Sequence, residues 1–193
     1  MPRLAAFLGG ALLGGAVLAA CTAPRTAMIS REHISATYSS LVLNAAGRYD
    51  GVALEVVGNP FVAQQADVNR AVLDNVRDTR LAANIPFTLD PPDPRSPYRL
   101  VVIFDAASGI SHPQVCKGSR RQADTPAGGV RMMMTYCLGE KAVTSLRARQ
   151  GGLNGPGDPA FGRFVRNATA ALFPPTTEIH DTGGRDKGGG FFD

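Results

Sequence analysis

Residues Tyr98–Asp105 read Tyr-Arg-Leu-Val-Val-Ile-Phe-Asp and form the strongest strand pattern in the chain. A nearly continuous apolar run of this length is typical of a strand covered on both faces, so we predict a central position in a sheet. Upstream, five prolines lie between Asn84 and Tyr98 and exclude a helix interior there. Between these prolines, Phe87–Leu89 is predicted to form a short edge strand.

Three further segments carry strand patterns. Gly51–Gly58 is rich in valine and bounded by glycines. Val130–Cys137 is an apolar run, and hairpin residues 138–141 connect it to residues 142–149. Because residues 142–149 have no strongly apolar face, we predict that they form an edge strand. Basic side chains would keep this edge from pairing with other chains; they are Lys141, Arg147 and Arg149.

Two amphipathic helices are predicted between and after these strands. Residues 66–80 place valines at helical spacing on one face. Residues 159–173 follow a helix-capping aspartate, Asp158, and stop before Pro174. Helices inserted among hairpin-connected strands indicate the α+β class. We therefore predict one small domain, with a mainly antiparallel sheet of about four strands and two helices packed on one face.

The N-terminal segment has the features of an export signal. Arg3 is followed by an uncharged apolar run that ends in Leu18-Ala19-Ala20-Cys21. These four residues resemble the lipobox of bacterial lipoproteins. The resemblance implies cleavage before Cys21, acylation of its thiol and stable attachment to a membrane through the lipid. The family's sorting rules place aspartate after the cysteine in inner-membrane lipoproteins, so Thr22 favours the outer membrane.

These features predict four segments along the chain. Residues 1–20 would be a removed signal peptide, and 21–50 a lipid anchor and tether. Residues 51–175 would form the globular α+β domain. The Gly-rich residues 176–193 would be a disordered tail. The mature protein would face the periplasm of a bacterial cell envelope.

Two cysteines remain once Cys21 carries a lipid. Cys116 and Cys137 lie 21 positions apart, and an even number of cysteines in an exported chain favours a disulfide. The alternatives are a redox pair or a metal site. Neither is favoured, because the sequence has no Cys-x-x-Cys motif and only one histidine, His112, close to Cys116.

Composition and motifs exclude several classes of protein. The chain has 193 residues and a net charge of +4, which is too small to indicate nucleic-acid binding. It contains no nucleophile elbow, phosphate loop or zinc-protease motif, so we assign no catalytic residue, metal or cofactor. One basic stretch, with Lys117, Arg120 and Arg121, is a candidate contact for an anionic ligand. Its alternative interpretation is a solvated loop.

Two hypotheses about function remain open. The first is a non-enzymatic binding or scaffolding module, lipid-anchored in the envelope, whose partner is an envelope protein, lipopolysaccharide or peptidoglycan. The second is a periplasmic hydrolase with an unrecognised site, for which His112 with Ser111 and an aspartate is one arrangement. Short segments resemble uncharacterised proteobacterial envelope lipoproteins, and the resemblance implies no activity; they are Gly58–Phe61, Tyr136–Cys137 and Leu172–Pro174.

Overall fold

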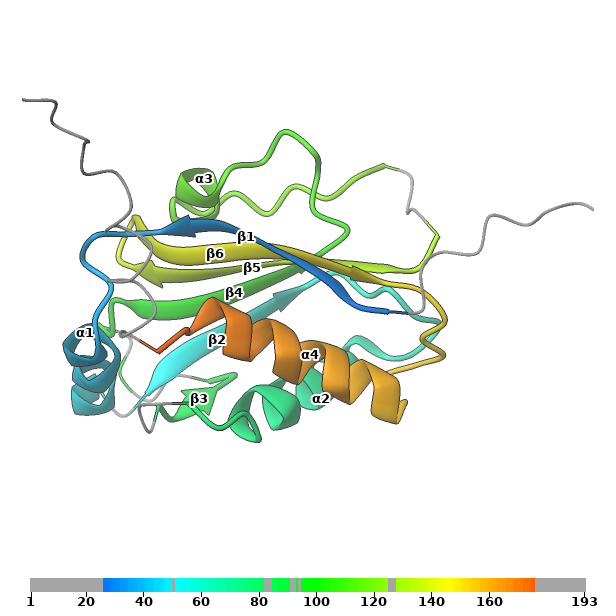
Figure 1. Cartoon of the computed structure of the whole chain (residues 1–193), viewed down its shortest axis with the longest axis horizontal. Helices are drawn as coiled ribbons and strands as arrows, with labels where there is room; N and C mark the ends of the chain where they lie inside the picture. Colours follow the sequence, from blue (N-terminus) through cyan, green and yellow to red (C-terminus); the bar gives the residue numbers. More distant parts are fainter. Residues whose placement is uncertain are drawn as a thin grey trace, which may run out of the picture.

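The computed structural model describes residues 26–49, 51–81, 85–90, 93, 95–124 and 128–175. The predicted signal peptide, Cys21, Thr22 and the predicted tail lie outside these ranges. The described part is α+β and is built on one sheet (Figure 1). Its elements are β1 (Met28–Ile34), α1 (Ser40–Ala45), the 3-10 turn η1 (Ala46–Tyr49), β2 (Val52–Val57), α2 (Gln65–Arg77), β3 (Phe87–Thr88), β4 (Tyr98–Phe104), α3 (His112–Cys116), β5 (Val130–Leu138), β6 (Lys141–Gln150) and α4 (Pro159–Leu172).

The sheet has six strands in the order β1-β6-β5-β4-β2-β3. The expectation of about four mainly antiparallel strands is therefore wrong in number, and the sheet is mixed, with three antiparallel and two parallel pairings. β4 is antiparallel to β5, but it is parallel to β2. The parallel pairs arise because the chain leaves β2 and crosses through α2 before it returns to the sheet, as a parallel connection requires.

The central position predicted for β4 is confirmed. Residues Leu100–Phe104 have no exposed surface, because alternate side chains enter apolar clusters on the two faces of the sheet. The short strand β3 lies at one edge, as its proline-rich surroundings predicted.

Two long helices cover the same face of the sheet. Figure 1 shows α2 and α4 side by side on one face and the short α3 on the other. The predicted cap of α4 is confirmed: the Asp158 carboxylate accepts a hydrogen bond of 2.8 Å from the Ala160 amide. Phe161 and Phe164 are fully buried beneath α4 and anchor it to the sheet.

The other end of the sheet differs from the prediction. Residues 28–34, expected in a tether, form the edge strand β1 and pair antiparallel with β6. β6 is therefore an interior strand, and the prediction that it lies at an edge is wrong. The segment after β1 also belongs to the folded unit, since Tyr38 is buried and donates a hydrogen bond of 2.7 Å to the Pro174 carbonyl. A domain boundary at residue 50 therefore does not match the structure.

The predicted disulfide is confirmed. Cys116 and Cys137 are bonded, with 5.6 Å between their Cα atoms, and join α3 to β5. Around this bond, Val101, Ile103 and Val115 form a small apolar cluster that holds α3 on the sheet. Within the described ranges, no helix is long and apolar enough to cross a bilayer.

Candidate ligand-binding groove

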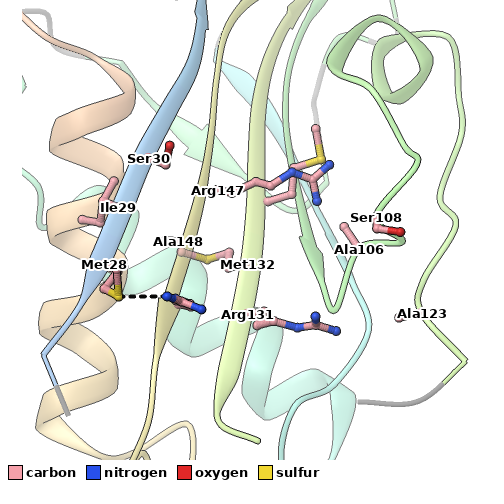
Figure 2. Close-up of a pocket in the computed structure, with 12 residues that line it drawn as sticks. Met28, Ile29, Ser30, Ala106, Ser108, Ala123, Arg131, Met132, Arg147 and Ala148 are labelled. Carbon is pink, nitrogen blue, oxygen red and sulfur yellow. Dashed lines mark hydrogen bonds between the residues drawn. The ribbon is translucent and has the colours of Figure 1, made fainter. Parts of the chain in front are cut away.

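An open groove lies on the face of the sheet that carries α3. Its volume is about 570 Å³, and β1, β5 and β6 form its base. The segment after β4 forms its far wall through Ala106, Ser108 and Ala123 (Figure 2). The α3 helix and the disulfide cover the rest of this face, so the groove is the uncovered part of the sheet.

Strand register brings three arginines together in the groove. Arg131 on β5 lies directly opposite Arg149 on β6, and Arg147 lies two residues before Arg149 on the same face. Met133 is opposite Arg147, and Met28 of β1 is opposite Arg149. The groove therefore combines guanidinium groups with flexible thioether side chains.

Two of these arginines have carboxylate partners. The Nε atom of Arg131 lies 3.1 Å from Oδ1 of Asp105. The Nε atom of Arg147 lies 2.7 Å from Oε1 of Glu32, and its Nη2 donates to the Ile110 carbonyl. Both guanidinium groups are held by these bonds and keep a third of their side-chain surface exposed, at 38% and 31%.

Arg149 is different, because no carboxylate pairs with it among the described residues. Its Nη2 atom instead lies 3.2 Å from the sulfur of Met28, a contact marked by the dashed line in Figure 2. A thioether is only a weak acceptor, so the charge of this exposed guanidinium has no anionic partner among the residues that the structure describes. Its direct neighbour across the strands is Arg131, and like charges in such a pair repel.

Asp105 holds Arg131 in position through both its side chain and its backbone. Its φ angle of 49° lies in the left-handed region, which costs about 1 kcal/mol outside glycine. Its backbone NH donates to the Arg131 carbonyl, and its own carbonyl accepts from the Ala123 amide at 2.7 Å. Since the residue is only 8% exposed, its carboxylate is fixed next to the Arg131 guanidinium. Such strain is often retained where a side chain must be aimed at a site.

The basic residues identified in the sequence, Lys117, Arg120 and Arg121, do not line the groove. Arg120 makes a two-pronged ion pair with Glu55, with both N–O distances 2.5 Å, and also donates to the carbonyls of Val115 and Ser119. Its charge is already matched and it holds the end of α3. Lys117 and Arg121 are exposed.

A pair of histidines lies elsewhere on this side of the sheet. The rings of His33 on β1 and His112 on α3 stack with centroids 4.3 Å apart. Burial lowers the pKa of His112, the nearby His33 lowers it further, and Glu32 opposes this shift. The Ser111 hydroxyl contacts Gln114 rather than an imidazole, so the described residues do not assemble the Ser111–His112 arrangement considered from the sequence.

The described residues contain no cluster of three or more histidine, cysteine or acidic side chains that could hold a metal ion. Comparison of the chain with protein-family models, curated proteins and solved structures gives no match. The geometry of the groove is therefore the main guide to function.

The groove was not predicted, although its signal is present in the sequence. Arg147 and Arg149 share one face of a strand, and this pattern was interpreted as protection of an edge. Arg131 was not singled out at all. The missing information was the pairing of β1 with β6, because this pairing turns an exposed edge into the base of a groove.

Proposed function

We propose that this protein is a lipid-anchored binding module of the bacterial cell envelope, and that the groove is its ligand site. The observation that carries the proposal is the guanidinium of Arg149, which has no carboxylate partner in the described part of the chain, beside two further arginines in an open groove. An arginine side chain stays protonated at all physiological pH values. It can therefore bind an anion, but it is poorly suited to exchange protons in a catalytic cycle.

The chemistry of the lining favours binding over catalysis. Its hydroxyl groups are those of Ser30 and Ser108, and no histidine or cysteine lines the groove within the described residues. A serine nucleophile needs an adjacent base, and arginine does not serve as one. The carboxylates of Asp105 and Glu32 are engaged by Arg131 and Arg147.

The anchor is supported by the residues that precede the described part. Leu18-Ala19-Ala20-Cys21 resembles a lipobox, and an acylated Cys21 would hold the domain at a membrane. The Cys116–Cys137 disulfide supports an oxidising compartment such as the periplasm. Thr22 favours the outer membrane, and an envelope protein, lipopolysaccharide or peptidoglycan is the proposed class of partner.

Acyl labelling and cell fractionation test the anchor. We expect the natural protein to incorporate labelled palmitate and to remain with the membranes, and Cys21→Ala to lose both properties. Membrane retention of the unlabelled Cys21→Ala protein would contradict the anchor.

Comparison of matched variants tests the groove. Cross-linking in intact envelopes from a probe placed at the groove should give adducts that are lost with Arg149→Gln and retained with Arg70→Gln. Arg70 is exposed on α2, on the opposite face of the sheet, so its substitution removes the same charge elsewhere. Equal loss in both variants would contradict the assignment of the groove.

A further inference from the structure

The groove begins close to the proposed lipid attachment point. Met28 lines the groove, and it lies seven residues after Cys21. Seven residues span at most about 25 Å when fully extended. If Cys21 is acylated, the Met28 end of the groove therefore stays within that distance of the bilayer surface. This step rests on the proposed function, because it uses the lipid on Cys21.

The charges in the groove match a ligand with a single negative charge. Arg131, Arg147 and Arg149 contribute three positive charges, and Asp105 and Glu32 contribute two negative charges. The balance is one positive charge, centred on the Arg149 side of the groove. The phosphodiester of a phospholipid carries one negative charge and presents two oxygens to a guanidinium fork.

The rest of the lining is suited to the apolar part of a lipid. Met28 borders the arginines and is 48% exposed although it is a large apolar side chain, and the buried Met133 lies at the floor of the groove. Methionine adapts its shape to irregular apolar ligands. Ala106 and Ala123 on the opposite wall leave room for a chain. An inorganic anion would use the guanidinium groups but not these apolar walls.

We propose that the groove binds the headgroup of one anionic phospholipid, such as phosphatidylglycerol, from the membrane to which the protein is anchored. The phosphodiester lies between Arg149 and Arg131, where it relieves the repulsion between their charges. The glycerol and the first acyl carbons lie along Met28. This second contact with the membrane holds the domain in a fixed orientation, with the groove facing the bilayer.

Binding of a short-chain lipid tests the proposal directly. The full-length protein in a maltoside detergent is titrated calorimetrically with dihexanoyl phosphatidylglycerol and with dihexanoyl phosphatidylcholine, which has the same chains but no net charge. Both lipids carry the phosphodiester, but the choline cation of the neutral lipid meets the excess positive charge of the groove, whereas the glycerol headgroup does not. We therefore expect the anionic lipid to bind at least about tenfold more tightly. Equal affinity for the two lipids would overturn the proposal.

Variants and competitors locate the site and identify its ligand. Arg149→Gln should weaken binding of the anionic lipid at least about tenfold, and Arg149→Lys should restore part of it. Arg70→Gln is the matched control and should bind like the natural protein. Binding unchanged in Arg149→Gln would overturn the proposal, as would inorganic phosphate or an acidic hexapeptide binding as tightly as the lipid.

Failure of the proposed anchor would give a different pattern from failure of this inference. Binding of a monomeric lipid does not require an acylated Cys21, whereas palmitate labelling does not involve the groove. Loss of labelling with retained lipid binding would contradict the anchor alone. Labelling and membrane retention without selective lipid binding would contradict the inference alone.

Discussion

Opening the Cys116–Cys137 disulfide should lower the free energy of unfolding by about 3 kcal/mol. The two residues are 21 positions apart, so the closed loop contains about 22 residues. In the chain-entropy model, closing such a loop removes about 11 cal/mol/K from the unfolded state, or about 3 kcal/mol at 25 °C. The perturbation is the double variant Cys116→Ala with Cys137→Ala, which leaves no buried thiol behind.

The structure also predicts where the effect is felt first. α3 has only five residues, which is too short for a helix to be stable on its own. Besides the disulfide, it is held by the small apolar cluster and by Arg99, whose Nη2 donates to the Cys116 carbonyl at 2.8 Å. Amide hydrogens of residues 115–119 should therefore exchange faster in the variant than those of β4.

Thermal unfolding measures the global effect. For a domain of about 150 residues, 1 kcal/mol corresponds to roughly 2–4 °C in Tm, so we expect a fall of roughly 6–12 °C. Reductant should lower the Tm of the natural protein by a similar amount and leave the double variant unchanged. A natural protein whose Tm does not respond to reductant would refute the reasoning. So would two reactive thiols, apart from Cys21, in the denatured and unreduced chain.

Three further predictions concern stability and are measured by urea unfolding. Tyr38→Phe should lower the free energy of unfolding by about 1–3 kcal/mol, because it leaves the Pro174 carbonyl without its donor. Tyr136→Phe should change the free energy of unfolding by less than about 0.5 kcal/mol or raise it, since the buried Tyr136 hydroxyl has no partner among the described residues. A larger loss in Tyr136→Phe than in Tyr38→Phe would contradict this. Burial and a neighbouring imidazole lower the pKa of His112 in the folded protein, so neutral His112 contributes its full stability above the ordinary pKa of 6.5, and this stability is lost as the pH falls below that value. In His112→Gln, the free energy of unfolding should depend less on pH in this range. A variant with the natural pH profile would exclude His112 as the source of the dependence. Gly58→Ala should cost more than about 1 kcal/mol, because φ is +84° and the new Cβ would overlap a neighbouring amide side chain; an unchanged midpoint would refute it.

The elements with strong periodicity were predictable from the sequence. β4 was recognisable because its apolar run continues across both faces, and the structure buries both faces. α4 was recognisable because Asp158 and Pro159 mark its first turn and Pro174 follows its end. The disulfide followed from the number of cysteines and not from their geometry. In each case, local chemistry was sufficient to identify the feature.

The strand β1 was not predictable from the same rules. Its sequence, Met-Ile-Ser-Arg-Glu-His-Ile, places polar side chains on both faces and is interrupted by a bulge between Arg31 and His33. An edge strand that is mostly exposed needs no strict alternation. The pattern therefore resembled a polar tether, and the strand forms only because β6 offers it a partner. The same error moved β6 to the edge of the sheet.

The parallel pairing of β2 with β4 was hidden for a related reason. An apolar strand carries no local mark of the direction of its neighbour, which depends on the path of the connection. The helix α2 between β2 and β3 permits a crossover, but the short β3 and the prolines before β4 obscured it. Sequence periodicity identifies strands more readily than it identifies their order.

The groove and the edge strand depend on each other. Met28 contacts Arg149, and Glu32 neutralises Arg147, so both partners that β1 supplies lie within seven residues. Without β1, the three arginines would form an exposed basic edge with one carboxylate, Asp105, among them. A ligand that binds only the assembled groove must therefore also stabilise the pairing of β1 with β6. The strand that sequence analysis placed in a tether thus links the proposed membrane anchor to the proposed binding site.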